Sequence, residues 1–473
     1  MPPPTLLTIY FLDIKPIVYR LNAITKFAIL QQFVDVLTVQ SAVCKIYLSL
    51  AIILIKIFMN KVLILGAGGV AKVTAVKCAQ QPEVFNEIVM ASRTKAKCDA
   101  IAETAKRLTG TTIQTDSVEI DLNDKTSLVE LFNKHRPNIC INLVDPYYDL
   151  VIMEACLAAK VNYMDTANYE PIDEAKLRYD EQWAMSDKFK EAGLLAVLGC
   201  GFDPGVSQAM TAYAAKHYFN EMQELHIMDC NAGNHGHVFA TNFSPEINLR
   251  EVAAPARYWN NGKWEEVGAV ITPTAPRADW HFAFDYPQIG PKETYLLYHE
   301  ELQSLVKNFP TLKVATFGMT FCEQYLAHLR VLQNVGMTRV DEVEYDGCKV
   351  VPVKFLKKLL PDPASLAKNY TGKTNIGCVV KGLGKNNEPK TYYIYNVCDH
   401  HQCYLETESQ GVSYTAGVPP MTGAKMILQG HWQGVGVFNV EQMNQDPFMQ
   451  ALMTDGLPWV EVFEQDVPEV KWN

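Results

Sequence analysis

Short apolar runs alternate with helically spaced segments over residues 62–198. The run Val-Leu-Ile-Leu at 62–65 is typical of a strand buried on both faces of a parallel sheet. Comparable runs predict five further strands, at 87–91, 112–121, 138–144, 162–165 and 194–198. Helical spacing predicts the intervening helices, at 73–79, 125–135, 151–159 and 183–192. This alternation predicts an α/β domain built on a doubly wound parallel sheet.

The pattern changes after about residue 206. Segments 208–219 and 295–309 have the spacing of helices, whereas 224–230 and 391–397 have the character of strands. The mixture predicts an α+β domain with an open, largely antiparallel sheet. The exposed face of such a sheet needs cover.

The chain therefore divides into predicted units. Residues 59–205 form the first domain and residues 206–415 the second. Within the second, 356–366 predict a helix and turn that act as a linker. Residues 416–473 are expected to be a C-terminal helical segment.

Residues 1–58 differ from the rest because they are apolar, β-branched and nearly free of acids. Segment 42–58 is almost long enough to span a bilayer, so a membrane anchor is one interpretation. Lys45 and Lys56 interrupt that segment, and no small-residue cleavage site follows it. Met59 directly precedes Asn-Lys-Val-Leu-Ile-Leu-Gly, where a nucleotide-binding domain commonly begins. We therefore expect residues 1–58 to lie upstream of the natural start.

A glycine-rich turn follows the first predicted strand. Gly66-Ala-Gly-Gly-Val-Ala71 places G-x-G-x-x-A between a strand and a helix, the context that dinucleotide binding requires. Gly66 permits the tight turn, and Gly68 lets the backbone approach a pyrophosphate. Gly69 and Val70 open the helix, whose free N–H groups can bind the phosphates. The pattern predicts a Rossmann-type cofactor site.

The end of the second strand indicates which dinucleotide binds. Ser92, Arg93 and Thr94 stand where an NAD-preferring site usually has an acid for the ribose 2′-hydroxyl, and Lys97 follows. Arg93 can form a bidentate contact with a 2′-phosphate, to which the hydroxyls can donate. The predicted cofactor is NADP(H).

Ligands of doubly wound sheets bind beyond the carboxyl ends of the strands. Asp121, Val144, Asp145, Pro146 and Asp165 end strands or follow them directly. Asp121, Val144 and Pro146 are predicted to contact the cofactor. Asp145 and Asp165 could hold an ammonium group or a reacting amine.

Composition narrows the class of protein. The 473 residues carry a net charge of −10 and are 48% hydrophobic and 20% charged, as expected for a globular protein with no nucleic-acid partner. The twelve cysteines are scattered rather than clustered like a secreted disulfide framework. Reduced thiols and a cytoplasmic location are expected.

Several later segments resemble one enzyme family. Gly199-Cys-Gly-Phe-Asp-Pro-Gly-Val-Ser207 is similar to the G-x-D-P-G junction of the saccharopine dehydrogenase family. Asn231-Ala-Gly-Asn-His235, Phe243-Ser-Pro-Glu-Ile-Asn-Leu-Arg-Glu251 and Tyr298-His-Glu-Glu301 resemble its carboxynorspermidine/carboxyspermidine dehydrogenase branch. Gly417-Val-Pro-Pro-Met-Thr-Gly-Ala-Lys-Met-Ile427 resembles the family's C-terminal helix, which packs on the first domain. The resemblance covers residues 59 to about 470.

The resemblance implies a reaction. Aspartate β-semialdehyde condenses with putrescine or 1,3-diaminopropane to an imine, which NADPH reduces in polyamine biosynthesis. It also implies a homodimer formed through the second domain.

Roles follow for residues of the resembling segments. Arg250 is expected to bind the substrate carboxylate, with Asn231 and Glu300 as further substrate contacts. His235 is the candidate for proton transfer at neutral pH, beside Asp165. Cys200 and Asp203, at the domain junction, are expected near the nicotinamide, in positioning roles.

No metal is expected. Asp399-His-His-Gln-Cys403 has a spacing too tight for two histidines on one helical face, and no second Cys/His group has zinc-binding spacing. A hairpin turn is the predicted structure there.

Two other functions fit the same sequence. A saccharopine or other opine-type dehydrogenase would use the same cofactor but needs a second Arg/Lys cluster for a dicarboxylate substrate. A non-catalytic, membrane-tethered relative would show no turnover and would require residues 1–58 in the native protein.

Overall fold

The computed structural model describes residues 59–172, 177–272 and 280–472. The predictions about residues 1–58 lie outside these ranges. Over the described residues, no helix combines the length and the apolar character needed to cross a membrane.

The first domain contains a seven-stranded sheet in the order β17-β6-β5-β4-β1-β2-β3, and every pairing between its strands is parallel. The strands are β1 (Lys61–Leu65), β2 (Glu87–Ser92), β3 (Gln114–Ser117), β4 (Ile139–Asn142), β5 (Asn162–Met164), β6 (Leu195–Leu198) and β17 (Gly436–Asn439). The intervening helices are α4 (Gly69–Ala79), α5 (Lys95–Thr109), α6 (Thr126–His135), α7 (Asp149–Ala159), α8 (Asp180–Trp183) and α9 (Ser186–Ala192).

Both faces of this sheet are covered, which explains the continuous apolar runs. Val62 and Ile64 of β1 belong to the core on one face, and Leu63 and Leu65 to a separate core on the other. All four side chains are fully buried. The prediction of a doubly wound parallel sheet is confirmed.

The third strand is shorter than predicted. β3 ends at Ser117, and Asp121 lies in an exposed turn where its carboxylate accepts the Asn123 N–H at 2.8 Å. β3 is the edge strand of the sheet and mostly polar, so its apolar pattern is weak.

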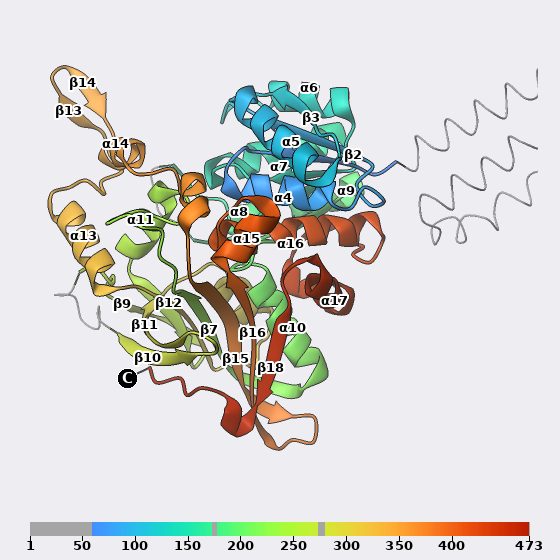
Figure 1. Cartoon of the computed structure of the whole chain (residues 1–473). Helices are drawn as coiled ribbons and strands as arrows, with labels where there is room; N and C mark the ends of the chain where they lie inside the picture. Colours follow the sequence, from blue (N-terminus) through green and yellow to red (C-terminus); the bar gives the residue numbers. More distant parts are fainter. Residues whose placement is uncertain (1–58, 173–176, 273–279, 473) are drawn as a thin grey trace, which may run out of the picture.

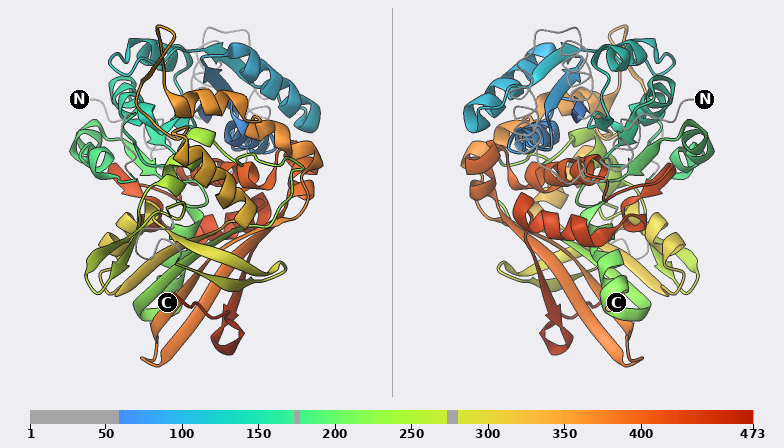
Figure 2. Two further views of the ribbon diagram at one scale, coloured as in Figure 1. Left: turned by 90° about the vertical axis from the view of Figure 1, so that its left-hand side faces the viewer. Right: turned by 90° about the vertical axis from the view of Figure 1, so that its right-hand side faces the viewer.

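The second domain is built on a nine-stranded mixed sheet (Figures 1 and 2). The strands are β7 (Phe219–Asn231), β8 (Ala256–Asn260), β9 (Lys263–Val267), β10 (His281–Tyr286), β11 (Gly290–Leu297), β12 (Val314–Thr320), β15 (Lys373–Gly384), β16 (Pro389–Asp399) and β18 (Trp459–Phe463). Among these strands only β12 and β7 pair in parallel, which confirms the predicted, largely antiparallel sheet.

Helices cover this sheet and connect it to the first domain. They are α10 (Val206–His217), α11 (Pro245–Ala253), α12 (Glu301–Asn308), α13 (Glu323–Asn334), α14 (Pro352–Leu359), α15 (His400–Thr407), α16 (Gly411–Leu428) and α17 (Gln445–Asp455). A small hairpin of β13 (Val343–Tyr345) and β14 (Cys348–Val350) extends from the body beside α14 (Figure 1).

Two element predictions were wrong in the second domain. The first residues of the predicted helix 295–309 belong to the end of β11. Thr294 and Leu296 are buried there while Tyr295 between them is partly exposed, and the helix starts only at Glu301. The predicted hairpin turn at 399–403 is the start of α15, because the Asp399 carboxylate accepts the N–H groups of His401 and Gln402 as a helix N-cap.

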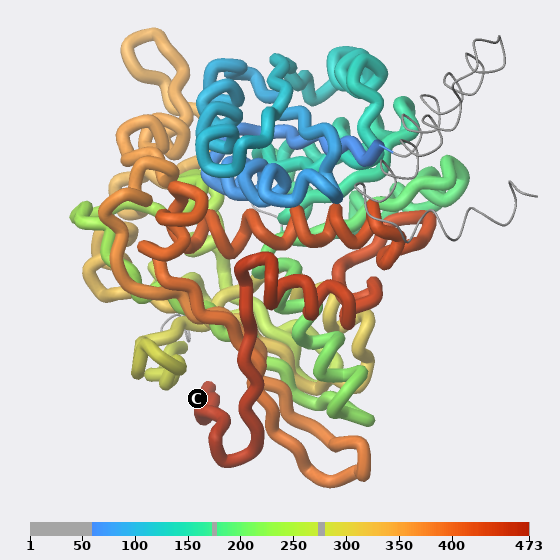
Figure 3. The backbone as a smooth tube through the Cα atoms, turned by 45° about the vertical axis from the view of Figure 1, so that its right-hand side comes forward, coloured from blue at the N-terminus to red at the C-terminus, as the bar shows by residue number. Residues whose placement is uncertain are grey.

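The long helix α16 lies against α4 of the first domain (Figure 3). The Thr74 hydroxyl of α4 donates to the Gly417 carbonyl at 2.8 Å. A side chain at Gly417 would meet the Val73 Cβ at 2.6 Å, so the close approach requires glycine there. Beyond α16 the chain gives β17 to the first sheet and β18 to the second, so residues 416–473 are not only helical.

Candidate active site

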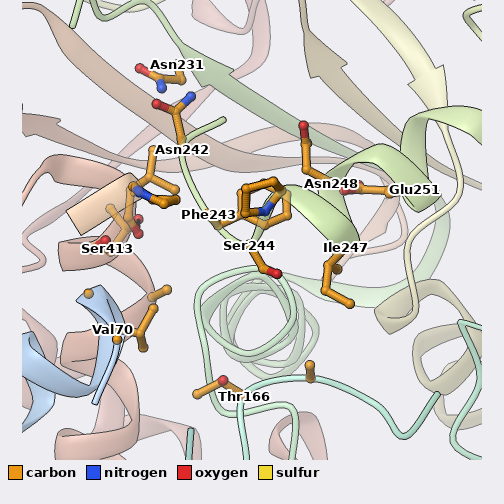
Figure 4. A pocket seen from close by; sticks show the side chains of 18 of the residues that line it. Val70, Thr166, Asn231, Asn242, Phe243, Ser244, Ile247, Asn248, Glu251 and Ser413 are labelled. Carbon is orange, nitrogen blue, oxygen red and sulfur yellow. Dashed lines mark hydrogen bonds between the residues drawn. The ribbon is translucent and has the colours of Figure 1, made fainter. Parts of the chain in front are cut away.

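A large cavity lies between the two domains, and most of the predicted site residues line it. Its volume is about 1760 Å³. Figure 4 shows Val70, Thr166 and Ser413 on one side, and the segment from Asn242 to Glu251 on another. Both the glycine turn and the substrate-domain segments therefore open into one space.

The glycine turn has the geometry that a pyrophosphate requires. Gly66 has φ +111°, and a Cβ there would meet the Leu143 carbonyl oxygen at 2.5 Å. A Cβ on Gly68 would meet no atom within 4 Å, so the space above it is open to a ligand. Gly68 is the N-cap of α4 and supplies no capping side chain, which leaves the N–H groups of the first turn free to bind phosphate.

The residues predicted for the 2′-phosphate surround the next part of the cavity. Ser92, Arg93, Thr94 and Lys97 all line it. In the described chain, neither the Arg93 nor the Lys97 side chain has a hydrogen bond or ion pair to another residue, whereas the side chain of neighbouring Lys95 pairs with Asp99 at 2.6 Å. Two unpaired cations fit a phosphate monoester and explain the absence of an acid at this strand end.

Strand-end residues continue the cavity wall. Val144, Asp145 and Pro146 line it, but Asp121 does not. The Lys357 ammonium lies 3.8 Å from Asp145 and 3.6 Å from Glu246, which fixes α14 near the strand ends.

Two predicted catalytic residues lie behind the wall rather than on it. Asp165 is buried and accepts hydrogen bonds from the Gly199 N–H and the Gln182 amide, both at 2.7 Å. Burial raises its pKa to about 7. Cys200 is fully buried, and its thiol donates to the Pro419 carbonyl at 3.6 Å. Burial and the nearby Asp165 raise the pKa of the Cys200 thiol, so it is not an activated thiolate.

Arg250 also lies outside the cavity. Its guanidinium pairs with Glu170 at 3.3 Å and donates to the carbonyls of Pro171 and Ile172. Both members of the ion pair are buried. The structure therefore gives Arg250 an ion pair within the protein where the sequence predicted contact with a substrate carboxylate.

The other residues predicted for substrate contact or proton transfer line the cavity, and Asn231 belongs to a network of hydrogen bonds. The Asn231 amide donates to the Tyr370 hydroxyl at 2.9 Å and accepts from His400 Nε2 at 2.9 Å. His400 Nδ1 accepts the Gly411 N–H at 2.9 Å, which sets its tautomer. His235 packs edge-on against Tyr370, and burial together with His237 lowers its pKa.

An acidic cluster around His299 forms another part of the wall, and the sequence indicated only part of it. Asp203, Asp229, Glu251, His299 and Glu300 line the cavity. His299 Nδ1 contacts Glu301 and lies 3.3 Å from Glu300, and Nε2 lies 3.8 Å from Glu251. The Glu251 Oε1 atom is buried without a hydrogen-bond partner. Asp229, Glu251 and His299 were not predicted as site residues, because only the folded chain brings β7, α11 and the loop before α12 to the same part of the cavity.

Burial and charge set the protonation of this cluster. Burial alone would lower the pKa of His299, but Glu301 and Glu300 raise it well above the usual value. Burial raises the pKa of Glu251 to about 8 and that of Asp229 to about 7, with His299 opposing both shifts. The free enzyme therefore keeps part of these carboxyl groups protonated near neutral pH, and a cationic ligand in the cavity would favour their ionised forms.

His299, Glu300 and Glu301 are also close enough together to ligate a metal ion. Glu301 is fully buried and already contacts His299 and Ser207. Those contacts account for the carboxylate without an ion.

The fold and the matches described below define an NADP(H)-dependent oxidoreductase with a cavity between a Rossmann domain and a mixed-sheet domain. Residues 62–197 match the family model described as saccharopine dehydrogenase NADP binding domain, and residues 201–457 match that of the saccharopine dehydrogenase C-terminal domain. The chain belongs to the saccharopine dehydrogenase family.

Individual relatives agree with this assignment. The chain is 54% identical to carboxyaminopropylagmatine dehydrogenase of Synechocystis over 87% of its length and 99% of the relative's. It is 40% identical to carboxynorspermidine synthase of Vibrio cholerae over 87% of this chain and 99% of that relative. The solved apo saccharopine dehydrogenase (L-Glu forming) of Saccharomyces cerevisiae shares the fold, with a TM-score of 0.64 at 15% identity over 86% of this chain and 100% of that one.

Proposed function

We propose that this enzyme catalyses the NADPH-dependent reductive condensation of L-aspartate β-semialdehyde with a cationic amine, a step of polyamine biosynthesis. The acidic cluster around His299 is the observation that carries the proposal. An amine that bears a second positive group can be held there by charge-assisted hydrogen bonds. The names of the Synechocystis and Vibrio relatives support the same substrate class.

The proposed reaction has two steps, imine formation and hydride transfer. The aldehyde and the primary amine lose one water and form an imine, which is reduced to a secondary amine by one hydride and one proton. Bound NADPH supplies the hydride. The protein must hold the iminium against the nicotinamide, keep it protonated and exclude water.

The names of the relatives also narrow the choice of amine substrate. Carboxyaminopropylagmatine, in the name of the 54% identical relative, is agmatine extended by a carboxyaminopropyl group. Agmatine is therefore our first candidate, and its guanidinium suits a cluster of several carboxylates. Putrescine and 1,3-diaminopropane, predicted from the sequence, are the second candidates, and the name of the Vibrio relatives favours 1,3-diaminopropane of these two.

We propose roles for the predicted residues according to their positions. Asn231, His235, Asp145 and Glu300 remain candidates for substrate contact or proton transfer because all four line the cavity. Asp165 would act indirectly, by holding the backbone N–H of Gly199.

The remaining predictions concern the setting of the enzyme. The eleven cysteines of the described ranges are all free thiols, which supports a cytoplasmic location. A homodimer formed through the second domain remains a prediction, and light scattering of the purified protein would test it.

The test is NADPH oxidation, followed at 340 nm with aspartate semialdehyde and one amine at a time. Agmatine, putrescine, 1,3-diaminopropane, glutamate and a blank without amine form the panel. We expect oxidation that depends on a cationic amine and is fastest with agmatine. Oxidation with glutamate alone would favour an opine-type enzyme instead. No oxidation with any amine, from a folded protein that still binds NADPH, would refute the proposal.

A further inference from the structure

Arg330 lines the cavity and forms no ion pair with any residue that the structure describes. It lies on α13, which also gives Tyr325 to the cavity wall, and Tyr295 of β11 lines the cavity as well. The Nε atom is buried and has no hydrogen-bond acceptor. Within the described ranges, no hydrogen bond or ion pair joins this guanidinium to another residue.

Acids near Arg330 in the cavity wall do not neutralise it. Glu293 pairs instead with His281 across the strands at 2.6 Å. Glu323, seven residues earlier on α13, is exposed and makes no ion pair with Arg330. A partly buried guanidinium without an acceptor is costly, so its place in the cavity wall indicates an anionic group on the ligand.

Other cations of the cavity are explained differently. Arg93 and Lys97 lie at the cofactor end, next to β2. Lys357 lies near Asp145 and Glu246. Lys292 and Lys358 are both exposed, and a single ammonium cannot make the two parallel hydrogen bonds with which a guanidinium binds a carboxylate.

We propose that Arg330 binds the α-carboxylate of the amino-acid semialdehyde and so makes the enzyme select an aldehyde that carries a carboxylate. This assignment rests on the proposed function. The two ends of the imine would then be held by groups of opposite charge. The carboxylate would bind a cation on α13, and the cationic amine would bind the acids around His299. The assignment also replaces Arg250, whose guanidinium is occupied by Glu170.

The test compares two aldehydes that differ only in the carboxylate, aspartate β-semialdehyde and 3-aminopropanal. Arg330→Met should lower kcat/KM for aspartate semialdehyde by about 10- to 100-fold, the cost of losing hydrogen bonds to a charged group. Its kcat/KM for 3-aminopropanal and its Kd for NADPH should stay within about twofold of the wild type. The kcat/KM of Arg330→Lys for aspartate semialdehyde should lie between the values of the wild type and of Arg330→Met.

Arg339→Met is the matched control, because Arg339 pairs with Asp341 on the exposed surface and lies outside the cavity. Equal losses with both aldehydes would make Arg330 a structural residue, and no loss with either would exclude the carboxylate contact.

Binding of L-homoserine to the NADP⁺ complex, measured by calorimetry, separates the two proposals. It needs no turnover, so weaker binding to Arg330→Met supports the contact even if the proposed reaction fails. Equal binding by wild type and variant would overturn the assignment.

Discussion

Glu251 shows how the position of one carboxyl group sets its protonation. It is 7% exposed, lines the cavity, and faces the His299 ring at 3.8 Å without a hydrogen bond to Oε1. Burial raises its pKa to about 8. Glu251 is therefore mostly neutral at pH 7 in the free enzyme, and a cationic substrate would favour its ionised form.

The pH dependence of amine use should report this carboxyl group. Because Glu251 ionises as the pH rises through about 8, the ratio of kcat/KM for the amine between wild type and Glu251→Gln should rise across pH 7–9. Deprotonation of the amine affects both proteins equally and cancels in the ratio. Initial rates at limiting amine give the profile.

Glu344→Gln is the control for this experiment, since Glu344 lies exposed on the β13–β14 hairpin. Its profile should match that of the wild type. A pH-independent ratio for Glu251→Gln would show that this carboxyl group does not contact the amine.

At the scale of single residues, a larger share of the predicted cofactor residues than of the predicted substrate and catalytic residues lines the cavity. The roles predicted for Gly66, Gly68 and Arg93 depend on backbone geometry and local charge, which a short sequence motif can reveal. Arg250 and Arg330 cannot be distinguished in this way. The ion-pair partner of Arg250 is Glu170, eighty residues earlier in the chain, whereas Arg330 has no such partner among the described residues, and only the fold reveals the difference.

At the scale of elements, the contact between α16 and α4 joins the end of the chain to the cofactor domain. Gly417 lies where a Cβ would meet Val73 at 2.6 Å and the Val70 carbonyl at 2.8 Å. Val70 itself lines the cavity, so this contact also supports the phosphate-binding end of α4.

Gly417→Val should destabilise the protein by about 1–3 kcal/mol, because the added side chain overpacks a tight helix contact. Urea unfolding followed by circular dichroism measures the loss. The matched variant is Gly68→Ala, whose Cβ would meet no protein atom within 4 Å. It should unfold like the wild type but bind NADPH more weakly. Equal stability of Gly417→Val and the wild type would contradict the packing described here.

Helices and strands could be predicted where their burial left a clear hydrophobic pattern in the sequence. Strands β1, β2 and β4 are covered on both faces and appear as apolar runs, whereas the polar edge strand β3 does not. Segment 295–309 was misassigned because the end of β11 and the start of α12 are only a few residues apart, so their two periods merge. β17 and β18 were missed, since each joins a sheet formed much earlier in the chain.

At the scale of the whole molecule, two sheets enclose one cavity and the last part of the chain returns to both. α16 packs on the Rossmann domain, β17 extends its sheet, and β18 extends the second sheet. The cavity between them contains a dinucleotide-binding turn, an acidic cluster and the unpaired Arg330. This arrangement can hold a cofactor, an amine and an amino-acid aldehyde at the same time, which reductive condensation requires.

The most direct test of this account follows one hydrogen atom. The enzyme is incubated with NADPH that carries deuterium at the transferred position, together with aspartate semialdehyde and agmatine, and the products are analysed by mass spectrometry. The account predicts a secondary amine that joins the two substrates and carries one deuterium on the carbon of the former aldehyde. Deuterium found only in homoserine, the alcohol of the same aldehyde, would contradict it, because the enzyme would then reduce the carbonyl rather than the imine.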